Sequence, residues 1–159
     1  MENKSSNKHE TDRIRLNTSA DVNKRIDKSI DDNIRFYATQ SKERITQRIE
    51  ELDKLWDVDR IIQGGAAGTS LFTLLLGAIG SKKWWLLTAT SLGFLGNHAI
   101  NGWSPSMYAL RSMGCRTRQE IEREKYALKA LRGDFDNEEF KNSTSIDERI
   151  KAAIEVTKK

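Results

Sequence analysis

Residues 61–103 decide the fold, and they read IIQGGAAGTSLFTLLLGAIG, then SKK, then WWLLTATSLGFLGNHAINGW. Each arm runs about 20 residues without a formal charge, which is the length a helix needs to cross a hydrocarbon core of about 30 Å. The charges between the arms are Lys82 and Lys83, in a connection too short for anything but an antiparallel return. The stretch therefore predicts a helical hairpin in a membrane.

The rest of the 159-residue chain is polar, so its average composition hides the hairpin. Charged residues make up 31% of the chain, and the formal net charge is +4. On both flanks the charges alternate in sign, as they do on solvated helix faces. A nucleic-acid interface needs clustered like charges with aromatic residues for stacking, so nucleic acid is not an expected partner.

The hydrophobic pattern predicts an all-α fold in five parts. They are a disordered tail (1–17), a cytoplasmic amphipathic helix (18–60), the two-helix transmembrane hairpin (61–103), interfacial and cytoplasmic helices (104–135), and a linker with a C-terminal amphipathic helix (136–159). The tail has no apolar segment and no periodicity, so we expect it to be neither a signal peptide nor an ordered element. The hairpin is expected to act as its own insertion signal.

The helix expected over 18–60 carries apolar residues at helical spacing on one narrow face. It begins at a capping-box pattern, Thr18-x-x-Asp21, and Thr39-Gln40-Ser41 can interrupt its stripe. Such a stripe can pack on the chain's own C-terminal region or on a second copy, lie on membrane headgroups, or dock another protein. Acidic residues dilute the basic face, which favours packing within the chain or between copies.

Helix-boundary signals follow one another closely after the hairpin. Ser104-Pro105 is an N-cap with proline at the first helical position, and Gly114 stops that short helix. Thr117-x-x-Glu120 is a capping box for the next helix, which Gly133 ends. A polar linker over 137–144 precedes a last helix with apolar positions at Ile146, Ile150, Ala153 and Ile154.

Aromatic and basic residues mark both ends of the hairpin. The expected interface anchors, which place rings and cations at headgroup level, are Trp56, Arg60, Trp84, Trp85 and Trp103. Near the open end of the hairpin lie nine basic residues, against two in the loop: Lys42, Arg44, Arg48, Lys54, Arg60, Arg111, Arg116, Arg118 and Arg123. The positive-inside rule therefore places both termini of a multi-pass protein in the cytoplasm.

Small residues on both arms predict close helix packing. The candidate packing residues are Gly64, Gly68, Gly93 and Gly96. Small-xxx-small faces let helix backbones approach closely. With the return at Lys82 as a mirror point, Gly68 faces Gly96 and Gln63 faces Asn101. The arms are therefore expected to pack on each other, and the glycine faces also suit association between copies.

Four polar residues form a polar mouth at the cytoplasmic end of the hairpin: Gln63, Asn97, His98 and Asn101. Polar residues inside a membrane are functional candidates. However, His98 lies about 21 Å along the helix from Trp84, near the interface, where burial costs less. Two interpretations stay open. Hydrogen bonding to the first arm or to headgroups is favoured over a proton, ion or ligand pathway.

No residue pattern points to catalysis. Cys115 is the only cysteine, so neither an intramolecular disulfide nor a cysteine-based metal site can form. Arg116 and Arg118 beside it favour a thiolate, but no base accompanies them. There is also no glycine-rich phosphate loop and no metal-binding histidine pair. We expect no enzymatic activity, no cofactor and no metal.

The run 98–135 contains His-Ala in the second arm, then Gly-Trp-Ser-Pro, Gly-Cys-Arg-Thr-Arg and Glu-Lys-Tyr-Ala-Leu-Lys-Ala-Leu-Arg-Gly-Asp-Phe. It resembles the YgaP-like transmembrane domain family of small bacterial inner-membrane proteins of unassigned function. The resemblance covers most of 20–135. The family commonly has Cys after Gly-Trp, where this chain has Ser104, and this chain lacks the rhodanese sulfurtransferase domain of some relatives. The resemblance implies a membrane hairpin in a bacterial inner membrane and no established activity.

Three functional hypotheses follow. The leading one is a non-enzymatic inner-membrane protein whose partners are the lipid bilayer and either further copies of itself or another membrane protein. The second is a subunit of an oligomeric channel or small-solute transporter, with Asn97, His98 and Asn101 at a pore entrance. The third is a soluble helical protein that buries the hairpin as its core and stays in the supernatant without detergent.

Overall fold

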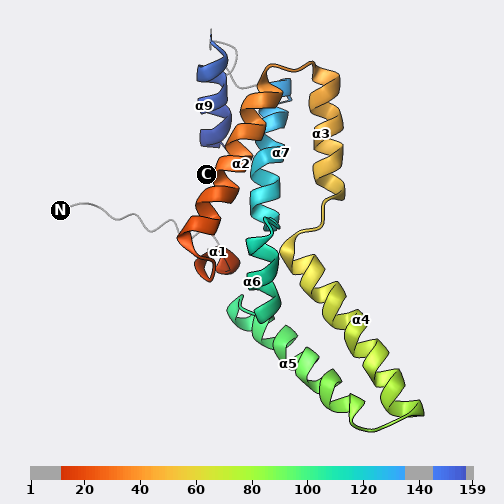
Figure 1. Ribbon diagram of the computed structural model, residues 1–159. Helices are drawn as coiled ribbons and strands as arrows, with labels where there is room; N and C mark the ends of the chain where they lie inside the picture. Colours follow the sequence, from red (N-terminus) through yellow and green to blue (C-terminus); the bar gives the residue numbers. More distant parts are fainter. Residues whose placement is uncertain (1–11, 135–144, 157–159) are drawn as a thin grey trace, which may run out of the picture.

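The computed structural model describes residues 12–134 and 145–156, and every regular element in those ranges is a helix. The all-α prediction is therefore confirmed. The helices are α1 (Arg13–Leu16), α2 (Ala20–Ala38), α3 (Lys42–Lys54), α4 (Val58–Ile79), α5 (Trp84–Asn101), α6 (Pro105–Ser112), α7 (Arg118–Arg132) and α9 (Ile146–Val156). In Figure 1, α2, α3, α7 and α9 form a bundle, and α4 and α5 project from it as an antiparallel hairpin. Helices α1 and α6 lie where the two bodies meet.

The bundle forms because each of its helices presents one apolar stripe. Isoleucines recur every four residues on α2 and again on α3, and they pack on Leu128 and Leu131 of α7 and on Ile150 of α9. This spacing keeps the apolar side chains on one helix face, so that a single core is shared by four helices. The apolar stripe over 18–60 therefore packs on the chain's own C-terminal helices, which is one of the partners predicted for it.

Three predictions for the N-terminal part are wrong. Residues 18–60 form α2, α3 and the first turn of α4 instead of one helix, because the chain turns at the interrupted stripe and α3 begins anew after Ser41, whose hydroxyl accepts the Arg44 N–H. Residues 12–17, which were expected to belong to the disordered tail, are ordered, because α1 buries Ile14 between hairpin and bundle. The Thr18 hydroxyl donates to the Ile14 carbonyl and caps no helix. Residues 1–11 of the expected disordered tail lie outside the described residues.

The helix boundaries after the hairpin are confirmed. The Ser104 hydroxyl accepts the Met107 N–H at the start of α6, and Gly114 follows that helix with a φ of 88°. Thr117 and Glu120 form the capping box of α7, and Gly133 ends it in the left-handed conformation. Helix α9 covers the expected last helix, whereas the linker over 137–144 lies outside the described residues.

The hairpin is polar inside and apolar outside. Between its arms lie Ser70, Thr73, Gly77 and Thr88, all buried, and the hydroxyls of Thr73 and Thr88 form a hydrogen bond of 2.7 Å. Large apolar side chains point away from the partner arm, with Phe72 62% and Ile79 84% exposed. A hairpin that served as a soluble core would show the opposite distribution. The main hydrophobic core lies in the bundle instead.

Among the described residues, one segment, Lys42–Ile79, which comprises α3 and α4, contains an 18-residue window that is long and apolar enough to cross a membrane. Only 22% of that window is buried. Helix α5 has 18 residues, but its last turns carry Asn97, His98 and Asn101, which lower its hydropathy. Length and composition therefore identify one candidate span, not two.

The glycines expected to bring the two arms together do not touch. A Cβ atom built on Gly68, Gly93 or Gly96 would meet no heavy atom within 4 Å, so the predicted apposition of Gly68 and Gly96 is wrong. Gly64 contacts only the ring of Trp56. The prediction placed residues at equal distances from Lys82 opposite each other. At the base of the hairpin, however, Asp59 pairs with His98, and these two residues do not lie at equal distances from Lys82. The contacts between hydroxyl residues, not the glycines, set the register of the arms.

Candidate functional site at the base of the hairpin

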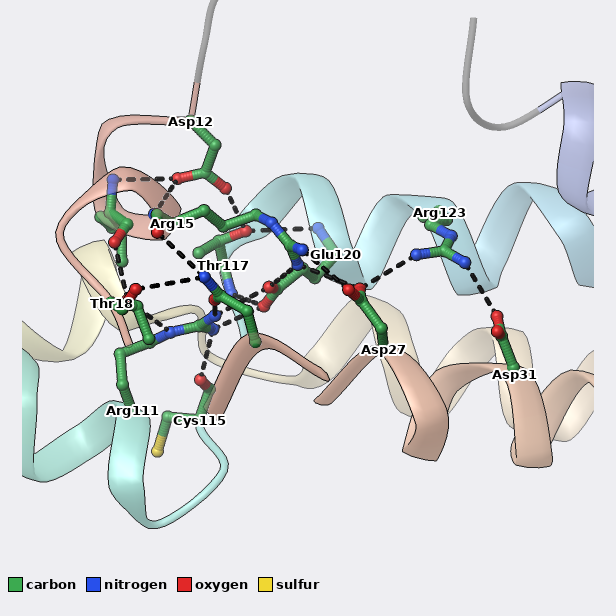
Figure 2. Close-up of polar contacts among 12 residues, drawn as sticks. Asp12, Arg15, Thr18, Asp27, Asp31, Arg111, Cys115, Thr117, Glu120 and Arg123 are labelled. Carbon is green, nitrogen blue, oxygen red and sulfur yellow. Dashed lines mark hydrogen bonds and ion pairs between the residues drawn. The ribbon is translucent and has the colours of Figure 1, made fainter. Parts of the chain in front are cut away.

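A network of buried ion pairs ties four helices together where the hairpin meets the bundle (Figure 2). Arg111 on α6 is 1% exposed and makes a bidentate pair with Glu120 on α7, with N–O distances of 2.6 and 2.8 Å. Arg15 on α1 reaches the same carboxylate at 2.5 Å and also binds Asp27 on α2 at 2.8 Å. One buried carboxylate therefore joins α1, α6 and α7, and Arg15 extends the link to α2.

Arg111 and Glu120 also form hydrogen bonds with groups other than each other. The Arg111 guanidinium also donates to the Thr18 hydroxyl, the Cys115 carbonyl and the Asn23 side-chain oxygen. Glu120 additionally accepts the backbone N–H of Thr117. Buried charges are tolerated when they are paired and their remaining donors and acceptors are used. Because these charged groups are paired with one another, we interpret the network as a structural joint between the helices.

The charged forms of Arg15 and Asp27 stabilise each other. The hydrogen bond to Asp27 is the main reason that the pKa of Arg15 lies above its ordinary value. Burial by itself would raise the pKa of Asp27. The hydrogen bonds and charges of Arg15 and Arg123 outweigh burial, so the pKa of the Asp27 carboxyl lies below its ordinary value. The pair therefore stays ionised at neutral pH.

A second buried carboxylate ties α3 to α7. Glu124 is fully buried and pairs with Arg48 on α3 and with Arg116 just before α7. Sequence reasoning identified Glu120 only as a capping residue and missed Glu124. The available signal was spacing, because Glu124 lies on the same helix face as Leu128 and Leu131. A charge on the apolar face of a helix predicts a buried partner.

A cleft of about 850 Å³ opens beside this joint, between α1, the start of α4, the end of α5 and the start of α7. In its wall, the Nε2 atom of His98 lies 2.9 Å from a carboxylate oxygen of Asp59, which links the last turn of α5 to the first turn of α4. The His98 side chain is 3% exposed, and its Nδ1 atom is buried with no hydrogen-bond partner among the described residues. The cleft therefore combines space and charge, and its wall contains a buried ring nitrogen that the cleft does not expose.

The structure divides the predicted polar mouth into two pairs. Gln63 and His98 line the cleft. The side-chain nitrogen of Asn97 donates to the Trp103 carbonyl, and that of Asn101 donates to the Asn97 side-chain oxygen. These two amides close the end of α5, so they do not face the cleft. For His98, the partner is the first arm, as the favoured interpretation expected, although sequence reasoning did not single out Asp59.

The five expected interface anchors are exposed and lie at the two ends of the hairpin. Trp84 and Trp85 begin α5 beside the loop, whereas Trp56, Arg60 and Trp103 lie at the base. The Arg60 guanidinium stacks over the Trp56 ring at 4.8 Å from its centroid. Paired aromatic and cationic groups of this kind suit a headgroup layer.

Cys115 packs against the small apolar cluster of Ile14, Val58, Ile62 and Met107 at the joint. Among the residues that the structure describes, no three His, Cys, Asp or Glu side chains are grouped as metal ligands would be. The thiol is therefore a packing residue of the joint.

No protein-family model, curated protein or solved structure matches the chain. The resemblance to the YgaP-like transmembrane domain family thus stays a prediction that rests on the residues quoted for it.

Proposed function

We propose that this is a small, non-enzymatic bacterial inner-membrane protein that self-associates as a structural or accessory membrane component, in line with its resemblance to the YgaP-like family. The α4–α5 hairpin is its membrane anchor, and the bundle lies on the cytoplasmic side with both termini. The observation that carries the proposal is the inverted hairpin, with hydroxyls between the arms and apolar side chains facing outward.

A bilayer explains this inversion. The 22 residues of α4 span about 33 Å, which matches a hydrocarbon core of about 30 Å. Each outward Leu, Ile or Phe favours insertion by about 0.3 to 0.6 kcal/mol near the centre of the membrane. The Thr73–Thr88 hydrogen bond satisfies polar groups that lipid could not. In water, the same exposed side chains would form one large apolar patch.

Membrane fractionation tests the anchor. The protein is expected to stay with membranes after alkaline carbonate extraction and to leave them in detergent. Phe72→Arg places a charge on the outer face of the hairpin, which costs about 2.5 to 3.5 kcal/mol at the centre of a membrane helix, so we expect more protein in the supernatant. The matched control is Phe36→Arg on α2, where the replaced ring is similarly exposed (56%) but lies on the bundle. Wild-type protein in the supernatant without detergent would instead support the soluble helical hypothesis.

Self-association is supported by the open glycine faces. Because a Cβ atom added to Gly68, Gly93 or Gly96 would meet no atom of the described residues within 4 Å, their surfaces are free to receive a helix of a second copy. Gly68→Ile and Gly96→Ile are expected to reduce crosslinked dimer in native membranes. Leu87→Phe, at an exposed position of α5 that lies about half a turn around the helix from Gly96, is expected to leave it unchanged. Crosslinking that finds only monomer in the wild type would contradict self-association.

A second candidate function, a subunit of a channel or small-solute transporter, is favoured by the cleft beside Gln63 and His98. Two helices cannot enclose a pathway, so this function requires an oligomer. Under it, His98→Ala changes solute flux in reconstituted vesicles between pH 5 and pH 8. Unchanged flux would exclude a role for His98 in conduction.

A further inference from the structure

Helix α1 caps the C-terminal end of α5. The last four carbonyls of a helix have no partner within that helix. In α5 the first of them, that of His98, accepts the N–H of Gly102 at 2.7 Å. The next two accept Nη1 of Arg13 at 3.1 and 2.8 Å, and the last accepts the side-chain nitrogen of Asn17, directly after α1, at 3.0 Å. These hydrogen bonds hold α1 at the level of the last turn of α5.

The four side chains of α1 have different surroundings. Arg13 reaches α5, Ile14 packs on residues of α4 and α6, and Arg15 pairs with carboxylates of α2 and α7. Leu16, by contrast, is 70% exposed. Within the described residues, the side chain of α1 that is left largely uncovered is therefore an apolar one.

Leu16 lies where the apolar surface of the hairpin ends. Because it comes between Arg13 and Asn17, it is held beside the last turn of α5. In that turn Ile100 is 73% exposed, and Trp103, one of the expected interface anchors, follows shortly after it. The outward apolar surface of the hairpin thus continues to the level of α1. For a hairpin inserted in a bilayer, this is the level at which hydrocarbon gives way to headgroups.

We propose that α1 is a membrane-interface element, and that its Leu16 side chain enters the boundary between the headgroups and the acyl chains of the bilayer. The lipid is favoured over the chain's own N-terminal segment, because residues 1–11 contain Met1 as their only apolar residue. The inference rests on the proposed insertion of the hairpin. It adds a third segment to the membrane anchor and places the buried ion-pair network directly on the membrane surface.

Spin labelling measures the depth of Leu16. In a Cys115→Ser background, Leu16→Cys is labelled with a nitroxide, and the protein is reconstituted in phospholipid vesicles. Oxygen concentrates in hydrocarbon and a hydrophilic nickel chelate stays in water, so the ratio of their collision rates with the label reports depth. We expect this ratio to be several-fold higher for Leu16→Cys than for the matched control, Phe36→Cys, whose position is 56% exposed on the bundle. Phe72→Cys, on the outer face of the hairpin, gives the reference for hydrocarbon.

Equal ratios at residues 16 and 36 would overturn the inference. If the label at residue 72 still reports hydrocarbon in that case, the role of α1 fails while the proposed anchor stands. If the label at residue 72 is also open to the nickel chelate, the anchor itself fails. Broadening of the spectrum at residue 16 that disappears on dilution with unlabelled protein would overturn the lipid and assign Leu16 to a contact with a second copy.

Discussion

Arg111 is the single residue on which the joint between hairpin and bundle depends most. Replacing it with methionine keeps much of its volume but leaves Glu120 buried with Arg15 as its one remaining basic partner. Removing one member of a buried ion pair costs about 3 to 5 kcal/mol, because the other charge stays desolvated. We expect Arg111→Met to lower the free energy of unfolding in detergent by that amount.

A matched exposed pair provides the control for this experiment. Arg118 also pairs with a glutamate of α7, Glu122, but its side chain is 76% exposed. Solvent screening limits such pairs to less than about 1 kcal/mol, so Arg118→Met should change stability little. Equal effects of the two substitutions would show that the Arg111–Glu120 pair does not hold the joint together.

Asp27 makes the free energy of unfolding depend on pH in the acid range. Its pKa in the folded protein lies below its ordinary value of 3.8, so the folded state binds the proton more weakly than the unfolded chain does. The resulting stabilisation is fully present above the unfolded pKa and is lost as the pH falls through the folded pKa. Asp27→Asn is therefore expected to be less stable than the wild type at pH 7, with the difference shrinking below about pH 4. A difference in unfolding free energy that is independent of pH would contradict this.

At the scale of helices, local capping chemistry was predictable and tertiary support was not. The boundaries of α6 and α7 follow from Ser104, Thr117 and Gly133, whose effects act within one turn. Helix α1 has four residues and could not be stable alone. It exists because Ile14 is buried at the joint while Arg13 reaches α5 and Arg15 reaches α7. No pattern within the residues of α1 indicates that they contact α5 and α7.

The candidate site was partly predictable for the same reason. Gln63 and His98 stand out as polar residues in apolar arms, and both line the cleft. Asp59 and Arg13 look like ordinary residues of polar flanks, and only the packing of α1 and α4 against α5 brings them to His98. The predicted contact between the glycines of the two arms was wrong because a small residue permits two helices to approach closely but does not require it. The arms approach at Gly77, which lies against the ring of Trp85.

Gly77 therefore differs from Gly68 in a way that substitution can measure. A Cβ atom at Gly77 would lie 1.9 Å from a ring carbon of Trp85, whereas at Gly68 it would meet nothing. We expect Gly77→Ala to displace the Trp85 ring and to change its fluorescence, in a protein whose other tryptophans are replaced by phenylalanine. Gly68→Ala should leave the emission spectrum of Trp85 unchanged. An identical spectrum in the Gly77 variant would mean that the ring does not pack in the hairpin as described.

At the scale of the molecule, the loop of the hairpin and the bundle lie at opposite ends (Figure 1). The ion-pair network fixes α1, α2, α6 and α7 together at the joint, so the hairpin extends from a rigid base. If the hairpin crosses the membrane, only the loop with Lys82 and Lys83 reaches the far side. The bundle then stays with the basic flanks in the cytoplasm, as the charge asymmetry predicts.

Cysteine labelling tests this topology directly, because Cys115 is the only native thiol. In a Cys115→Ser background, Ser81→Cys reports on the loop and Ser41→Cys on the turn between α2 and α3, both at exposed positions. In intact spheroplasts, a membrane-impermeant maleimide is expected to label the loop site and to label the bundle site only after lysis. If neither site reacts before lysis, the loop does not cross the membrane and the hairpin lies on the cytoplasmic surface. If the bundle site alone reacts, the orientation is reversed, and the basic flanks do not control insertion.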